Sequence, residues 1–222
     1  MSRKKNVISL VIGIVGVCIG MAALLLFVNY ALMSFSIGAR MPLMIITYYL
    51  PAMAPIILVI VNKEKLSDFG FRKEKIGLQI LTGIGLGIGM SVVFTLVPHL
   101  LGLGEYVDNG VRYKYLWQFV FEFVYLIIGV GAVEEFIFRG FFYTRFKNIF
   151  GKEFLAVILS SVLFGLFHIA GGSIIQILIT GMLGALFCFF RLKIKHCSTL
   201  SLIIMHGVYD GLISVMASLL LK

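Results

Sequence analysis

Residues 7–33 read VISLVIGIVGVCIGMAALLLFVNYALM, and stretches of this kind decide the fold. The stretch has no Asp, Glu, Lys or Arg, and its apolar residues do not alternate with polar ones as in a strand of a membrane barrel. An α-helix needs about 20 such residues to cross a bilayer. Residues 7–33 therefore predict a membrane-spanning helix, which is retained because no A-x-A-like cleavage site follows it.

Further apolar stretches of similar character follow along the chain. They lie at 41–61, 76–100, 116–143, 154–170, 174–190 and 200–221. The composition agrees with a membrane protein, since 60% of the residues are hydrophobic and 13% are charged, against about a quarter charged in average globular chains. We predict an all-α polytopic bundle of seven spans, or eight if the fourth stretch breaks near Gly129 and Gly131. It forms a single membrane domain over residues 1–222.

The basic residues predict how the bundle lies in the membrane. The chain has 19 Lys and Arg against 10 Asp and Glu, but these basic residues sit in short segments between apolar stretches, so they do not indicate a nucleic-acid partner. With a cytoplasmic N-terminus and seven spans, only Arg40, Arg112, Lys114 and Lys222 fall on the outer side. Because cytoplasmic loops of membrane proteins are rich in Lys and Arg, this asymmetry predicts a multi-pass protein of the cell membrane with its N-terminus in the cytoplasm.

Two other segments predict how the helices pack and how one loop meets the membrane. Alternate glycines at 83, 85, 87 and 89 form two GxxxG pairs inside an apolar stretch, a pattern typical of close helix packing. Residues 63–75 mix charged residues with Leu66, Phe69 and Phe71, which favours a short interfacial element on the cytoplasmic face.

Ionisable side chains inside a membrane are costly, so each one in the apolar stretches indicates a function or a specific partner. The first group is Glu134, Glu135 and Arg139. On a helix Glu135 and Arg139 are four residues apart and can pair, which leaves the neighbouring Glu134 free to act as a general base or acid. The alternative is an ion pair that only ties helices together, but it leaves Glu134 without a partner.

Two histidines complete a candidate site. His168 and Glu134 lie equally far along the sequence from Gly151, and in an antiparallel helical hairpin such residues lie at the same height. His206 and Asp210 are four residues apart and share a helix face, as a carboxylate-oriented histidine or as two ligands of one metal. Each histidine could instead make a structural hydrogen bond, but one shared site explains all three motifs together.

The three motifs EEFIFRG (134–140), FGLFH (164–168) and HGVYD (206–210) resemble, in order, those of the CPBP family, the CAAX proteases and bacteriocin-processing enzymes also called Abi. The resemblance covers residues 116–217 and includes the type II CAAX prenyl endopeptidase. It implies a catalytic set of Glu134, His168, His206 and Asp210, supported by Glu135 and Arg139. Glu134 would activate water beside His168, while His206 and Asp210 would stabilise the oxyanion or hold the water.

One position departs from the prenyl endopeptidase, which has Asn where this chain has Asp210. An ionised carboxylate cannot donate a hydrogen bond to an oxyanion, so Asp210 must be protonated, orient His206 or bind a metal. Zinc held by Glu134, His168, His206 and Asp210 is one possibility. We favour the metal-free version, because it gives every residue a single role.

The sequence therefore predicts an intramembrane endopeptidase that cleaves a membrane-associated peptide or protein with glutamate-activated water. It lacks the HExxH motif of zinc-dependent intramembrane proteases and the GxGD motif of the aspartyl class. Two other functions fit the polar cluster. One is a non-catalytic membrane immunity or scaffold protein, and the other is a proton-coupled carrier, although such carriers often have repeated halves and none is visible in the sequence.

Overall fold

The computed structural model describes residues 1–107, 110, 112–171 and 174–220, and all regular elements in these ranges are helical. The α-helices are α1 (Arg3–Leu26), α2 (Ile37–Thr47), α3 (Met53–Val61), α4 (Ile76–Ser91), α5 (Leu116–Val124), α6 (Ala132–Glu135), α7 (Tyr143–Phe150), α8 (Glu153–Phe167), α9 (Ile174–Lys193) and α10 (Thr199–Leu220). The predicted all-α bundle is confirmed. Two residues of our count lie outside the described ranges, Leu221 at the end of the last predicted span and Lys222 among the outer charges.

Six helical segments of the described chain are long and apolar enough to cross a membrane. They are Arg3–Ser34, Ile37–Val61, Ile76–Leu103, Leu116–Phe150, Ile174–Lys193 and Thr199–Met216. The remaining predicted span, 154–170, forms the 15-residue helix α8, which is shorter than the others. The chain is therefore an integral membrane bundle by the length and apolar character of its helices.

The eight-span alternative is wrong, because the fourth stretch does not break. Tyr125–Gly131 and Phe136–Phe142 are π-helical turns that join α5, α6 and α7 into one helix from Leu116 to Phe150. Both Gly129 and Gly131 keep helical geometry within it. A π-turn adds a residue to a helical turn without ending the helix.

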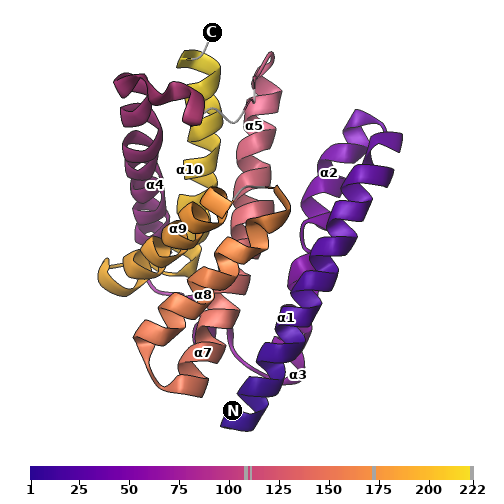
Figure 1. Ribbon diagram of the computed structural model, residues 1–222, viewed down its shortest axis with the longest axis vertical. Helices are drawn as coiled ribbons and strands as arrows, with labels where there is room; N and C mark the ends of the chain where they lie inside the picture. The colour runs from indigo at the N-terminus through magenta and orange to yellow at the C-terminus, as the bar shows by residue number, and fades with distance from the viewer. Residues whose placement is uncertain (108–109, 111, 172–173, 221–222) are drawn as a thin grey trace.

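Helix α10 lies in the middle of the bundle and carries part of the site. In its apolar stretch 61% of the residues are buried, compared with 17–28% in the other five membrane-length segments. It packs mainly on α4 and on the turn Tyr125–Gly131, while α1 packs on α3 and α7. Figure 1 shows a column of α1, α2 and α3 diverging from α5 toward the end of the bundle where the C-terminus lies, with the N-terminus at the other end.

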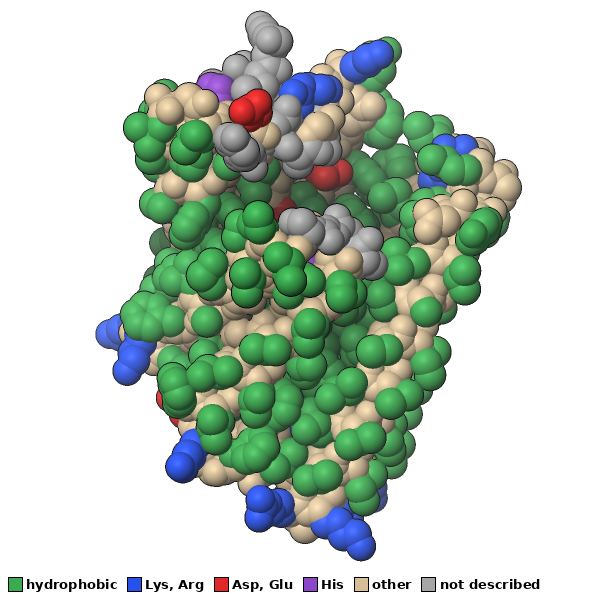
Figure 2. All heavy atoms as spheres, in the orientation of Figure 1, with side chains coloured by type: hydrophobic (Ala, Val, Ile, Leu, Met, Phe, Trp, Pro, Cys, Tyr) green, Lys and Arg blue, Asp and Glu red, His purple; other side chains and the backbone are tan. Residues whose placement is uncertain are grey.

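The outer surface of the bundle is apolar. Val11, Ile19 and Leu26 of α1 are all more than half exposed, as are many aliphatic side chains of the other helices. Figure 2 shows hydrophobic side chains covering this face, with most of the visible Lys and Arg at the lower end and side. This distribution suits contact with lipid, while the side of the membrane on which the basic end lies remains a prediction.

One of the two predicted glycine pairs makes a close helix contact. A Cβ atom added at Gly83 would lie 2.6 Å from the carbonyl oxygen of Ser201, and one at Gly87 would lie 2.8 Å from that of Met205. Added at Gly85 or Gly89, it would meet nothing within 4 Å. The predicted packing is confirmed for the first pair, which brings α4 against α10, and not for the second.

The loop before α4 is docked into the core, which the prediction of an interfacial element did not include. Leu66 is exposed, but Phe69 at the end of the same 3-10 turn is completely buried. Its ring stacks on Phe141 with centroids 6.3 Å apart, and its carbonyl accepts a 2.7 Å hydrogen bond from the hydroxyl of Thr199. The loop therefore braces α10 and the long helix on the side of the site nearest the N-terminus.

Candidate active site

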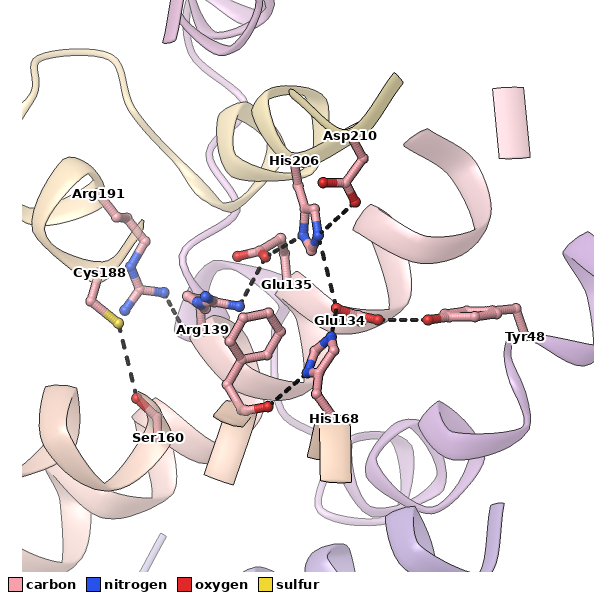
Figure 3. A network of polar contacts seen from close by, with 11 residues as sticks. Tyr48, Glu134, Glu135, Arg139, Ser160, His168, Cys188, Arg191, His206 and Asp210 are labelled. Carbon is pink, nitrogen blue, oxygen red and sulfur yellow. Dashed lines mark hydrogen bonds and ion pairs between the residues drawn. The ribbon is translucent and has the colours of Figure 1, made fainter. Parts of the chain in front are cut away.

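The two adjacent glutamates lie near the middle of the long helix and are both buried, with 2% and 0% of their surfaces exposed. Because successive helical residues point about 100° apart, they face different neighbours. Figure 3 shows Glu134 between Tyr48 and the two histidines, and Glu135 between Arg139 and His206. The separation of roles predicted for the pair therefore has a structural basis.

Glu135 belongs to a buried charge cluster. Its Oε1 accepts hydrogen bonds from Arg139 Nη1 at 2.9 Å and from His206 Nδ1 at 2.8 Å. The Arg139 guanidinium also lies 4.0 Å above the Phe164 ring and 4.7 Å from the centroid of the Phe187 ring, positions in which aromatic faces attract a cation. The predicted pairing of Glu135 with Arg139 is confirmed, and the contact with His206 extends it to α10.

Glu134 has one satisfied oxygen and one without a partner. Its Oε1 accepts a 2.6 Å hydrogen bond from the hydroxyl of Tyr48. Its Oε2 is buried and has no hydrogen-bond partner within the described part of the chain. This second oxygen lies 3.9 Å from Nε2 of His168 and 3.9 Å from Nε2 of His206. Those separations are too long for direct hydrogen bonds and are compatible with a bridging molecule.

Both imidazole rings are held by their other nitrogen. Nδ1 of His168 lies 2.9 Å from the carbonyl oxygen of Phe164, which can only accept, so Nδ1 carries the proton. Nδ1 of His206 likewise donates to the carboxylate of Glu135. Each ring therefore directs Nε2 toward Glu134.

Asp210 lies on the other side of the His206 ring from Glu135. Its Oδ2 is 3.3 Å from His206 Nε2, and its side chain is 31% exposed. We expected Asp210 to be a candidate for orienting His206, but it is Glu135 that holds Nδ1. The physical reason is that Glu135 is completely buried and already fixed by Arg139, whereas Asp210 reaches the nitrogen that faces the open part of the site.

The hairpin prediction for His168 agrees with the structure. Gly151 ends α7 with a φ of 66°, a left-handed conformation that glycine adopts without strain, and α8 then runs back along the long helix. His168 follows α8 directly and so lies at the height of Glu134. All four predicted catalytic residues, Glu134, His168, His206 and Asp210, are thus brought to one place.

The same four side chains are imidazoles and carboxylates, which are ligands that zinc binds in proteins. In both histidines Nδ1 is held by a hydrogen-bond acceptor, as is usual for histidines that bind a metal through the other nitrogen. Ligand atoms of a tetrahedral zinc ion lie roughly 3.3 Å apart, given bonds of about 2.0–2.1 Å. The Oε2 to Nε2 distances are 3.9 Å, and as they stand no three His, Cys, Asp or Glu side chains in the described ranges are close enough to hold an ion. The residues are therefore of the types that bind zinc, but their donor atoms would have to move closer together for all of them to coordinate one ion.

The sequence argument missed Tyr48. It lies at the C-terminal end of α2, 86 positions before Glu134, and its ring packs edge-on against Tyr125 with centroids 5.8 Å apart. A tyrosine in an apolar stretch before Pro51 is not a distinctive signal. Only the packing of α2 on the turn Tyr125–Gly131 places its hydroxyl on the glutamate.

Comparison with known proteins agrees with the motif analysis. No curated protein and no solved structure matches the chain. Residues 116–212 match the family model of Rce1-like type II CAAX prenyl endopeptidases, and this range contains all three motifs and the four side chains described above. Residues 116–212, less than half of the chain, are therefore similar to the Rce1-like type II CAAX prenyl endopeptidases, in agreement with the resemblance of the motifs.

Proposed function

We propose that the protein is an intramembrane endopeptidase that hydrolyses a peptide bond of a membrane-associated peptide or protein, with Glu134 as the general base. The observation that carries this proposal is the buried, unpartnered Oε2 of Glu134, which faces Nε2 of both histidines. Oε2 of Glu135 also lacks a hydrogen-bond partner among the described residues, so the argument for Glu134 rests on where its free oxygen lies, which is 3.9 Å from Nε2 of each histidine.

In the proposed reaction a water molecule lies between Glu134 Oε2 and His168 Nε2. It gives one proton to Glu134 while its oxygen attacks the scissile carbonyl carbon, and its other hydrogen is held by the lone pair of His168 Nε2. Tyr48 holds Oε1, so the carboxylate keeps Oε2 directed at the water. The two imidazole rings and the carboxylate are already fixed by their other hydrogen bonds, so they hold the water in an orientation suited to attack.

Attack places a negative charge on the former carbonyl oxygen. His206 stabilises this charge by donating a hydrogen bond from Nε2. The proton on Nε2 is shared with Asp210, whose Oδ2 lies 3.3 Å away. Asp210 therefore holds or releases the proton of His206 Nε2 and does not itself donate to the oxyanion. This role explains why a carboxylate can stand at this position. Glu134 then returns its proton to the leaving amine as the C–N bond breaks, giving an amine and a carboxylic acid, which loses its proton to water.

A zinc ion in this site would be held by Glu134, His168 and His206, and it would act as a Lewis acid toward the scissile carbonyl. The variant His206→Gln distinguishes the two versions, since glutamine donates a hydrogen bond but is a poor zinc ligand. In the metal-free mechanism the variant keeps measurable cleavage. Loss of both cleavage and one equivalent of bound zinc, with restoration by zinc after chelation in the wild type, would contradict the metal-free version.

The decisive experiment is a proteomic comparison of membranes that contain the wild-type protein or Glu134→Gln at equal abundance. We expect cleavage products in the wild-type sample that are missing from the mutant. If Glu134→Gln supports full cellular function while the protein is abundant, the scaffold or immunity function would replace the protease. A carrier would instead show proton-coupled uptake into vesicles that depends on the same residue.

A further inference from the structure

The site lies about midway along the long helix, between two very different halves of the bundle. Glu134 is about 27 Å from the beginning of that helix at Leu116 and about 24 Å from its end at Phe150, at 1.5 Å per residue. A substrate must therefore cross one half to reach it. The packing on each side shows which half admits one.

The half nearest the N-terminus is filled. Below Glu134 the long helix buries Ile137, Phe138, Phe141 and Phe142, each no more than 2% exposed, and Phe69 of the preceding loop is completely buried among them. All five belong to one continuous hydrophobic core. Interiors packed in this way leave no passage for a peptide.

A buried ion pair closes the same half further down. Arg145 is completely buried and donates to Glu64 at 2.7 Å and to Asn6 at 3.3 Å, so it ties α7 to the loop after α3 and to α1. Its guanidinium lies 4.5 Å from the centroid of the Phe141 ring. Opening a path here would require breaking this cluster.

In the other half, polar side chains at the level of the site are partly exposed, although Ser214, one turn beyond Asp210 on α10, is 1% exposed. On α10 the side chain of His206 is 7% exposed and that of Asp210, one turn further on, is 31% exposed. Phe164 near the end of α8 is 3% exposed, while the side chain of His168, directly after α8, is 25% exposed. The site is thus open at Asp210 and at His168, on the side of Glu134 away from the filled half.

The helices also separate in that direction. α2 packs against the turn Tyr125–Gly131 at the level of the site, whereas α5, which continues beyond it, packs mainly on α10. Figure 2 shows a recess at the upper end between the column of α1, α2 and α3 and the rest of the bundle, with acidic side chains inside it. Glu122 of α5 is partly exposed on this side of Glu134.

From these observations we infer that substrate reaches Glu134 from the end of the bundle opposite the N-terminus. Combined with the predicted cytoplasmic N-terminus, this makes the site extracytoplasmic. The substrate is then a membrane-associated peptide or protein whose cleavage segment has already been translocated, and not a cytoplasmic protein tail. The inference deepens the proposed function and rests on it, but the direction of access can be tested without any cleavage.

The test uses single cysteines and a charged, membrane-impermeant methanethiosulfonate reagent. In a Cys18→Ser background the two remaining cysteines are completely buried. Asp210→Cys and Glu122→Cys probe the recess on two different helices, and Glu105→Cys and Lys152→Cys report the two ends. Modification is read as loss of later labelling by a fluorescent maleimide, in intact cells and in inverted membrane vesicles.

In intact cells we expect the reagent to modify Asp210→Cys, Glu122→Cys and Glu105→Cys and so to block their later labelling by the maleimide. In inverted vesicles we expect it to modify Lys152→Cys. Modification of Asp210→Cys from the Lys152 side, or from neither side, would overturn the direction of access. Modification of Lys152→Cys in intact cells would overturn the extracytoplasmic assignment. None of these outcomes depends on activity, so the test fails or succeeds separately from the Glu134→Gln experiment.

Discussion

Glu134 and Glu135 allow the same substitution to be made at adjacent, equally buried positions with opposite expected results. Glu135 neutralises Arg139, whose guanidinium is enclosed by the rings of Phe164 and Phe187. Glu135→Gln removes the negative charge and leaves that guanidinium buried without a counter-ion. Glu134→Gln strands no cation, since its direct hydrogen-bond partner is the hydroxyl of Tyr48, and a glutamine carbonyl can still accept from it.

The magnitudes differ accordingly. Breaking a buried ion pair by removing one partner costs about 3–5 kcal/mol. For a chain of this size each kcal/mol lowers Tm by about 2–4 °C, so Glu135→Gln should lower Tm by about 6–20 °C. Glu134→Gln exchanges one hydrogen-bond acceptor for another and should cost less than about 1 kcal/mol, while it abolishes cleavage.

Thermal unfolding of the purified proteins in detergent, alongside their yield in membranes, measures both effects. The double variant Glu135→Gln, Arg139→Met is a useful control, because replacing a buried ion pair by uncharged side chains is often nearly neutral. We expect it to recover most of the lost stability. If Glu135→Gln unfolds within about 2 °C of Glu134→Gln, less than about 1 kcal/mol, Arg139 does not depend on Glu135 and the assignment of separate roles is refuted.

Three further results are expected. Tyr48→Phe leaves the buried Oε1 of Glu134 without its donor, so it should lower Tm by about 3–12 °C, since a hydrogen bond to a charged group contributes about 1.5–3 kcal/mol. It should also lower the cleavage rate by about tenfold to a hundredfold; an unchanged rate would remove Tyr48 from the mechanism. Gly83→Ala should destabilise the protein by about 1–3 kcal/mol through its contact with α10, whereas Gly85→Ala should be neutral or slightly stabilising, as chemical or thermal unfolding would show. Burial raises the pKa of the Cys197 thiol to about 12, so at pH 8 it stays protonated and N-ethylmaleimide should modify it only after unfolding, as peptide mapping by mass spectrometry can establish; rapid modification of the folded protein would contradict this.

The amino-acid sequence was sufficient for the class of fold and for most of the site. Long uncharged stretches leave a bilayer-spanning helix as the stable state of their backbone, so the all-α bundle follows from local composition. The spacing of Glu135 and Arg139, and the equal distances of Glu134 and His168 from Gly151, are local or nearly local relations that helical geometry converts into contacts. These relations could therefore be read before the structure was known.

The tertiary structure decided what depends on packing between distant segments. Tyr48 meets Glu134 because α2 packs on the π-turn of the long helix, and Glu135 rather than Asp210 orients His206 because Arg139 fixes it within reach of Nδ1. The continuity of the fourth helix and the use of Gly83 rather than Gly85 against α10 were settled in the same way. Such contacts depend on the rotation and height of whole helices, and these are set by the sum of many side-chain contacts that no short sequence pattern records.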